Sequence, residues 1–220
     1  MINWNEKSIE WYLRSGMIEP YAKDIVYSIK DYIIDKDVID AGCGIGVTSY
    51  FLAKYAKSVL AVDNQERPLD FAKEYFKDEE KITFKNCDIF DLEKKSSDVL
   101  LAISVGQLVD MNMEVLDIAR NYTILVSPVE REVIPKKPCC AGDEDILKEN
   151  NIKYKKLYVE TCFGQHYKSM EDFEEFIKEY NMEDIREDAL KNLIEIKGEY
   201  PLYLKNKKKL RVLIIERKNV

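Results

Sequence analysis

Three glycines at alternate positions, Gly42, Gly44 and Gly46, form the part of this sequence best suited to chemistry. Glycine has no Cβ, so a turn built from it lets a ligand lie against bare backbone amides. Val38 and Ile39 just before the turn are β-branched and predict a buried strand, and the residues after it take up a helical period. A strand, a glycine turn and a helix N-terminus together predict a site for a nucleotide-like ligand.

An acidic residue ends the next expected strand. Residues 58–63 are mostly apolar and finish at Asp63, where a carboxylate can accept hydrogen bonds from ribose hydroxyls. A dinucleotide-binding turn reads G-x-G-x-x-G, whereas this one reads G-x-G-x-G, with Val47 in the place of the third glycine. The spacing therefore disfavours a nicotinamide or flavin enzyme.

The stretch from Asp40 to Gly46, followed by Asp63, resembles the first two motifs of class I S-adenosylmethionine-dependent methyltransferases. A third strand agrees, because it ends at Asp88 and Ile89, where that family contacts the adenine. The match runs from about residue 38 to residue 104. The resemblance implies S-adenosylmethionine as the cofactor.

The resemblance also implies a role for single residues. Gly42 and Gly44 would admit the methionine and ribose portions, and Asp40 would orient the turn. Other strand ends would hold the ribose hydroxyls, the adenine and the methionine end. Each aspartate could instead simply begin a loop after its strand. The implied cofactor residues are Asp40, Gly42, Gly44, Asp63, Asn64, Asp88, Ile89 and Ser104.

Catalytic residues are harder to predict, because methyl transfer depends mainly on positioning the acceptor. A general base is needed only when the acceptor must lose a proton. His166 is the only histidine and one candidate base, and Glu130 after the fifth strand is a candidate for acceptor contact. A lone histidine in a loop is more often simply solvated surface. Cys139 and Cys140 could bind a soft metal, but adjacent cysteines do not easily ligate together, so we predict no metal site.

Length and composition narrow the class of protein. The 220 residues fit a single domain, and the net charge of −7 disfavours nucleic acid as a partner. The one basic cluster, from Lys205 to Arg211, contains no aromatic residue for base stacking. Five cysteines without a disulfide pattern and the lack of a long apolar run predict a cytoplasmic protein that does not cross a membrane.

Strands alternating with helices predict a doubly wound, mostly parallel, seven-stranded α/β sheet, the Rossmann-like methyltransferase fold. Helices in residues 3–34, with Gly16 as a break, would form a lid. Residues 37–126 would form the cofactor-binding core, and residues 127–220 an acceptor-side insert and closing strands. Finer predictions are a helix at 113–120, a loop at 127–142, a turn at 164–168, a helix at 182–197 and a C-terminal antiparallel hairpin from Tyr203 to Arg217.

The function that the sequence favours is methyl transfer from S-adenosylmethionine to a small-molecule acceptor. Two alternatives stay open: an RNA-directed methyltransferase, and a protein that binds the cofactor without turnover. A nicotinamide oxidoreductase ranks last because of the glycine spacing. The acceptor and the oligomeric state have no recognisable signature in the sequence.

Overall fold

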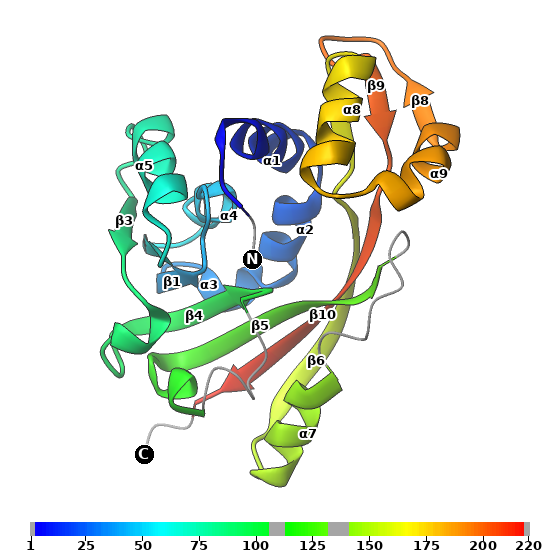
Figure 1. Ribbon diagram of the computed structural model, residues 1–220. Coiled ribbons are helices and arrows are strands. Elements are labelled where there is room, and N and C mark those ends of the chain that lie inside the picture. The colour runs from blue at the N-terminus through cyan, green and yellow to red at the C-terminus, as the bar shows by residue number, and fades with distance from the viewer. Residues whose placement is uncertain (1–2, 106–112, 132–140, 218–220) are drawn as a thin grey trace.

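A seven-stranded sheet forms the centre of the computed structural model, which describes residues 3–105, 113–131 and 141–217 (Figure 1). The strand order is β3-β2-β1-β4-β5-β10-β6, with β1 to β5 parallel and β10 antiparallel to both β5 and β6. The strands are β1 (Asp37–Ala41), β2 (Ser58–Asp63), β3 (Ile82–Asn86), β4 (Ser97–Ile103), β5 (Ala119–Arg131), β6 (Tyr154–Cys162) and β10 (Lys207–Glu216). This topology confirms the doubly wound, mostly parallel α/β fold that the alternating pattern predicts.

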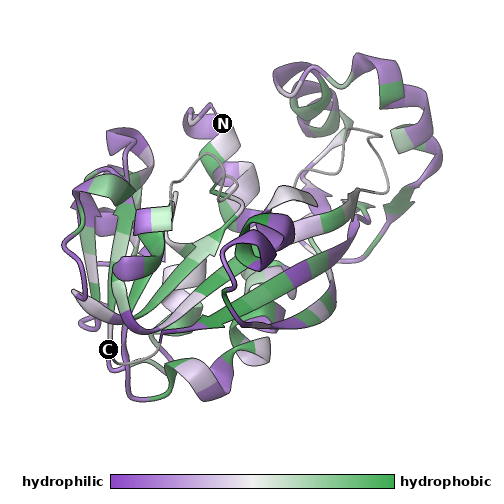
Figure 2. Ribbon diagram, turned by 90° about the horizontal axis from the view of Figure 1, so that it is seen from below, coloured by the Kyte–Doolittle hydropathy of each residue, from purple (hydrophilic) through white to green (hydrophobic). Residues whose placement is uncertain are grey.

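Helices cover both faces of this sheet, as its apolar strands require (Figures 1 and 2). The helices are α1 (Glu6–Ile18), α2 (Tyr21–Ser28), α3 (Lys30–Ile33), α4 (Val47–Leu52), α5 (Glu66–Tyr75), α7 (Ala141–Glu149), α8 (Met170–Glu179) and α9 (Arg186–Lys191), with short 3-10 turns η1 (Ile89–Asp91), η2 (Met113–Asp117) and η3 (Glu183–Ile185). One buried cluster packs α2, α3 and α4 on the sheet, and a second packs η2 and α7 on its other face. Burial on both sides explains why the central strands are almost wholly apolar.

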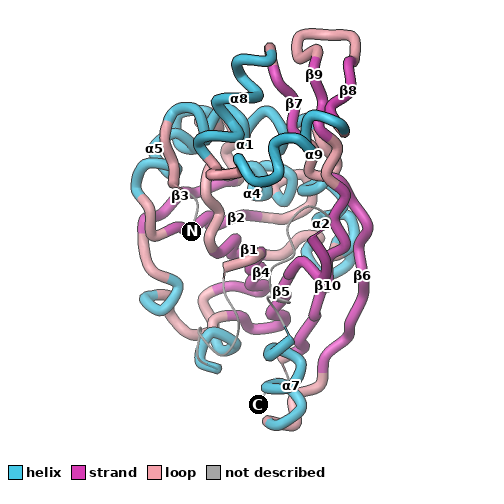
Figure 3. The backbone as a smooth tube through the Cα atoms, turned by 45° about the vertical axis from the view of Figure 1, so that its right-hand side comes forward, coloured by secondary structure: helices cyan, strands magenta, loops and turns pink. Residues whose placement is uncertain are grey.

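A smaller antiparallel sheet stands apart from the main one, at the end of the molecule opposite α7 (Figure 3). Its strands are β7 (Gln165–Tyr167), β9 (Leu202–Leu204) and β8 (Leu193–Glu195), in that order. Together with α8 and α9 they form what we call the β7–β9 module, residues 165–204. Its core contains Phe173 and Tyr167 and also Trp11 from α1, so the module packs against the N-terminal helix.

The prediction of a C-terminal antiparallel hairpin from Tyr203 to Arg217 is wrong. β9 pairs with β7 and β8 in the small sheet, whereas β10 pairs with β5 and β6 in the large one. The predicted turn at 164–168 contains β7, and the predicted helix at 182–197 divides into η3, α9 and β8. The secondary structure of these segments depends on strand partners that are far apart in the sequence. The local hydrophobic period does not reveal such partners.

Three local predictions also need correction. Gly16 does not interrupt the first helix but lies inside α1, where an added Cβ would come 3.0 Å from Cγ1 of Val47. The expected loop at 127–142 begins as strand, because β5 continues through Pro128 to Arg131, and residues 132–140 lie outside the described part. The helix at 113–120 is a 3-10 turn that gives way to β5. Within the described residues, none of the helices has both the length and the apolar character needed to cross a membrane.

Candidate functional site

The glycine turn joins the carboxyl end of β1 to α4. Gly42, Gly44 and Gly46 have φ angles of 70°, 53° and 79°, in the left-handed region that favours glycine. The amides of Gly42 and Cys43 both donate to the carbonyl oxygen of Val62, at 2.8 and 3.0 Å. The turn is thus bound to the end of β2, and its conformation requires the glycines that the sequence supplies.

Asp63 lies beside this turn at the end of β2, with only 8% of its surface exposed. Its Oδ2 accepts from the amide of Gly44 at 2.8 Å, and its Oδ1 accepts from the amide of Gln65 at 2.9 Å. A carboxylate oxygen can accept more than one hydrogen bond, so both oxygens keep capacity for ribose hydroxyls. The structure therefore brings the predicted acidic residue and the predicted turn into direct contact.

Asp40 is buried beneath the turn, 2% exposed, where the Oγ of Ser49 donates to its Oδ2 at 2.6 Å. Burial, with a smaller contribution from the negative charge of Asp63, raises the pKa of Asp40 to about 7, against the opposing effect of the Ser49 hydrogen bond. Cys43 is also near this pair, and burial raises the pKa of its thiol. Asp40 can therefore change charge near neutral pH, directly below the turn.

The other predicted cofactor residues lie at neighbouring strand ends. Asp88 caps the 3-10 turn after β3, accepting from the amide of Phe90 at 3.1 Å, while Ile89 is partly buried against the sheet. Ser104, just after β4, has a φ of 55°, which is rare for a residue other than glycine and recurs at functional sites. Asn64 is exposed in the loop after β2. All eight residues thus lie at or just after the carboxyl ends of the parallel strands.

His166 lies elsewhere, on β7 of the small sheet, and is 7% exposed. Its Nε2 is 2.7 Å from Oε1 of Glu19, the C-cap residue of α1. Glu19 also accepts from the amide of Gly164 at 3.2 Å and from the hydroxyl of Tyr203 at 3.3 Å. The histidine, itself part of the β7–β9 module, is therefore held by a carboxylate at the end of α1, with the geometry of an oriented imidazole.

The remaining candidates are Glu130, Cys139 and Cys140. Glu130 falls in β5, in register with Lys209, but the described part of the structure does not include its side chain. Cys139 and Cys140 lie outside the described residues. Among those described, no group of three or more histidine, cysteine or acidic side chains is arranged to hold a metal.

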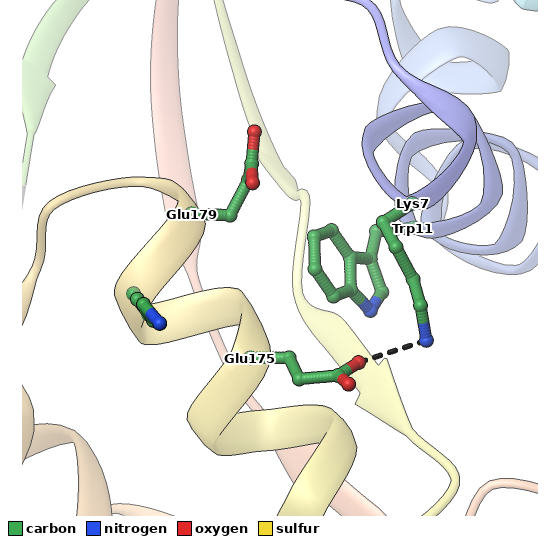
Figure 4. A pocket seen from close by; sticks show the side chains of 5 residues that line it. Lys7, Trp11, Glu175 and Glu179 are labelled. Atoms are coloured by element: carbon green, nitrogen blue, oxygen red, sulfur yellow. Dashed lines mark ion pairs between the residues drawn. The ribbon is translucent and has the colours of Figure 1, made fainter.

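A surface pocket between α1 and α8 lies away from the glycine turn (Figure 4). It is lined by Trp11 and by charged side chains, of which Lys7 and Glu175 form an ion pair at 2.8 Å. The ion pair joins α1 to the β7–β9 module. None of the predicted site residues lines this pocket.

Sequence reasoning missed two side chains that pack on the turn. A Cβ at Gly42 would meet Cγ2 of Val105 at 2.6 Å, and a Cβ at Gly44 would meet Cζ2 of Trp4 at 2.9 Å. Val105 follows β4 and Trp4 precedes α1, so both contacts are long-range and have no periodic signal in the chain. The buried Glu19 was missed for the same reason.

Comparison with known proteins agrees with this geometry. A family model described as a methyltransferase domain matches residues 38–126. The ubiquinone biosynthesis O-methyltransferase of Vibrio vulnificus is 26% identical over 112 residues, which are 50% of this chain and 48% of that protein. The enzyme of the same description from Coxiella burnetii is 24% identical over 177 residues, covering 78% of this chain and 70% of the other. The match to the Vibrio relative thus spans only about half the length of that protein.

Solved methyltransferase structures share the fold of this chain. A crystal structure of magnesium protoporphyrin IX methyltransferase from Synechocystis with bound S-adenosylhomocysteine superposes with a TM-score of 0.57 at 16% identity, over 99% of this chain and 89% of that one. The fold is that of the class I S-adenosylmethionine-dependent methyltransferase superfamily, and the methyltransferase-domain match covers residues 38–126 of the chain. The cofactor of this superfamily is S-adenosylmethionine, and the residues present suit it. Three left-handed glycines shape the turn, and Asp63 is oriented by two amides with acceptor capacity to spare.

Proposed function

We propose that this chain is an S-adenosylmethionine-dependent methyltransferase that acts on a small-molecule acceptor. The observation that carries the proposal is the hydrogen bond from the amide of Gly44 to Asp63. It joins the turn expected to receive the methionine portion to the carboxylate expected to receive the ribose, at the edge where ligands of such sheets bind.

The roles of the cofactor residues follow from their positions. Asp63 accepts from the ribose hydroxyls, and Asp88 accepts from the adenine amino group while Ile89 packs on the ring. Gly42 and Gly44 carry the turn that receives the methionine and ribose portions, with Asp40 below them. These assignments are supported by the superfamily motif and by the convergence of the strand ends.

The chemistry needs little from the protein beyond positioning. When bound, the cofactor supplies a methyl group already activated by its sulfonium. The protein must hold the acceptor in line with that methyl and exclude water, an effect of roughly 7–11 kcal/mol at most. Ser104 at the end of β4 is suited to the methionine end of the site.

The acceptor atom that we propose is oxygen, because the curated relatives are named as O-methyltransferases. An alcohol or phenol must lose a proton, so a base is useful. His166, oriented by Glu19 at 2.7 Å, is our candidate base, and Glu130 is a candidate acceptor contact. The same Glu19–His166 bond would also serve a purely structural role. A His166→Gln variant separates the two, since loss of a base lowers turnover without changing the affinity for S-adenosylhomocysteine.

The experiment for the whole proposal is release of S-adenosylhomocysteine from S-adenosylmethionine in the presence of a panel of small phenols, alcohols and carboxylic acids. The Asp63→Ala variant is the control for protein-dependent release. Binding of S-adenosylhomocysteine without turnover on any acceptor would favour the non-catalytic alternative. Binding of NADH but not of S-adenosylhomocysteine would reject the proposal.

The RNA-directed alternative is weakened by local charge. Tyr158 does lie near Lys156 and Lys209, at 5.9 and 5.6 Å from its ring, an arrangement that the sequence alone did not reveal. However, Lys156 forms an ion pair with Glu144 at 2.9 Å, and Glu144 also binds the buried Arg211.

The free thiols of Cys43, Cys87 and Cys162 are consistent with the cytoplasmic location that we propose.

A further inference from the structure

Trp4 packs on the central glycine of the turn. It is 7% exposed, and a Cβ on Gly44 would lie 2.9 Å from its Cζ2 and 3.5 Å from its Cη2. The benzene ring of the indole therefore lies against the peptide that donates to Asp63. One side of Gly44 is fixed by the ring and its amide is fixed by the carboxylate.

The position of this indole is itself determined by neighbouring contacts. Asn5 caps α1 reciprocally with Ser8: the Asn5 side chain accepts from the Ser8 amide at 2.9 Å, and the Ser8 hydroxyl accepts from the Asn5 amide at 2.8 Å. Tyr12, one helical turn further along, meets the indole edge-on with ring centroids 5.3 Å apart. Tyr12 in turn packs on Phe163 at 5.2 Å. A capped helix start and an aromatic row thus hold the ring over the turn.

We propose that Trp4 is a positioning residue of the cofactor site, which keeps Gly44 and its bond to Asp63 in the geometry that binds S-adenosylmethionine. This rests on the function proposed above, since the role of the turn is part of it. Gly44 has no side chain and a left-handed φ, so few contacts restrain it. A large flat ring supplies the missing restraint and excludes water from the Gly44–Asp63 bond.

The chain provides a matched control. Trp11 is the only other tryptophan, lies on α1 seven residues after Trp4 and is 1% exposed. It points toward α8 rather than toward the turn, with its Nε1 donating to Asp172 at 2.7 Å (Figure 4). Substitution of Trp11 therefore tests the loss of a buried indole from α1 without touching the glycine turn.

The experiment uses calorimetry and intrinsic fluorescence with S-adenosylhomocysteine. Trp4→Ala should lower the affinity by roughly 3- to 10-fold, the value of a lost aromatic contact, and Trp4→Phe should restore most of it. Trp11→Phe should bind as the parent does while leaving Trp4 as the only tryptophan. In that variant, S-adenosylhomocysteine should change the tryptophan emission with the dissociation constant found by calorimetry, whereas Trp4→Phe should show no such change.

The possible failures are distinguishable. If the parent binds S-adenosylhomocysteine but Trp4→Ala binds it equally well, the proposal for Trp4 is wrong and the proposed function stands. An unchanged emission spectrum in Trp11→Phe at saturating ligand overturns it as well, and this measurement decides the matter if Trp4→Ala does not fold. If the parent does not bind the ligand at all, the proposed function fails, and the role of Trp4 fails with it.

Discussion

Replacement of Asp40 by asparagine should change how the stability of the protein depends on pH. In the folded chain the pKa of Asp40 is raised to about 7, first by burial and then by the charge of Asp63, whereas its ordinary value is 3.8. The folded state therefore holds the proton more tightly than the unfolded state does. The resulting stabilisation is complete below about pH 4 and is lost as the pH rises through 7.

The size of the effect follows from this interval. At 1.36 kcal/mol for each pH unit, the difference between 3.8 and about 7 corresponds to about 4 kcal/mol, of which more than half falls between pH 5 and pH 8. Asparagine keeps the shape of the side chain and an acceptor for the Ser49 hydroxyl, but it does not titrate. The free energy of unfolding of Asp40→Asn relative to the parent should therefore rise by about 2–3 kcal/mol from pH 5 to pH 8.

The assay is urea unfolding of both proteins at several pH values, compared as a difference so that other titrating groups cancel. Tyr12 and Cys43 face the same site, but the pKa of each is raised, chiefly by burial, so they stay neutral in this range. Ser49→Ala serves as the second variant. It removes a hydrogen bond that favours the charged form and should move the transition to higher pH. A difference that stays flat from pH 5 to pH 8 would refute the reasoning, because Asp40 would then be ionised throughout.

Three further perturbations address the site and its support. Asp63→Ala should weaken binding of S-adenosylhomocysteine by about 1.5–3 kcal/mol, measured by calorimetry, and parental affinity would remove this residue from the site. Gly46→Ala should destabilise the fold by about 1–3 kcal/mol, because its φ is 79° and the new Cβ would lie 2.8 Å from a β3 aromatic ring; Gly198→Ala, with a φ of 133° and open space, should cost less in thermal unfolding. Arg14→Ala should cost about 3–5 kcal/mol, since it leaves Asp172 buried without its ion pair at 2.8 Å; Asp172→Asn, which removes the charge instead, should cost less, and equal losses would contradict a charge effect.

The positions of the glycine turn and of the acidic strand ends could be predicted from sequence because their signals are local. A buried strand, a glycine turn and an acidic strand end each occupy a few consecutive residues. The parallel sheet then brings the strand ends to one edge, as the handedness of such connections requires. The contact between Gly44 and Asp63, two residues 19 positions apart, follows from this topology alone.

The remainder depended on contacts that have no local signal. In the sequence, Pro128 is typical of a loop, yet β5 continues through it. The proline lacks an amide hydrogen, and the pairing of β5 with β10 becomes irregular opposite it, between Lys209 and Leu210, which accommodates the missing donor. Gly16 resembles a helix breaker, but it is needed for close packing on Val47. In both cases the partner element determines the meaning of the residue.

The helix α1 connects the glycine turn, which could be predicted from the sequence, to the β7–β9 module, which could not. One side of it carries Tyr12 and Leu13 toward the glycine turn, through apolar contacts that specify no single geometry. The opposite side carries Trp11 and Arg14 to Asp172 of the β7–β9 module, through a buried and directional ion pair and hydrogen bond. Directional buried bonds fix relative position more strictly than apolar packing does. Movement of α1 over the cofactor turn should therefore carry the module with it, so that binding at the turn and the shape of the acceptor side change together.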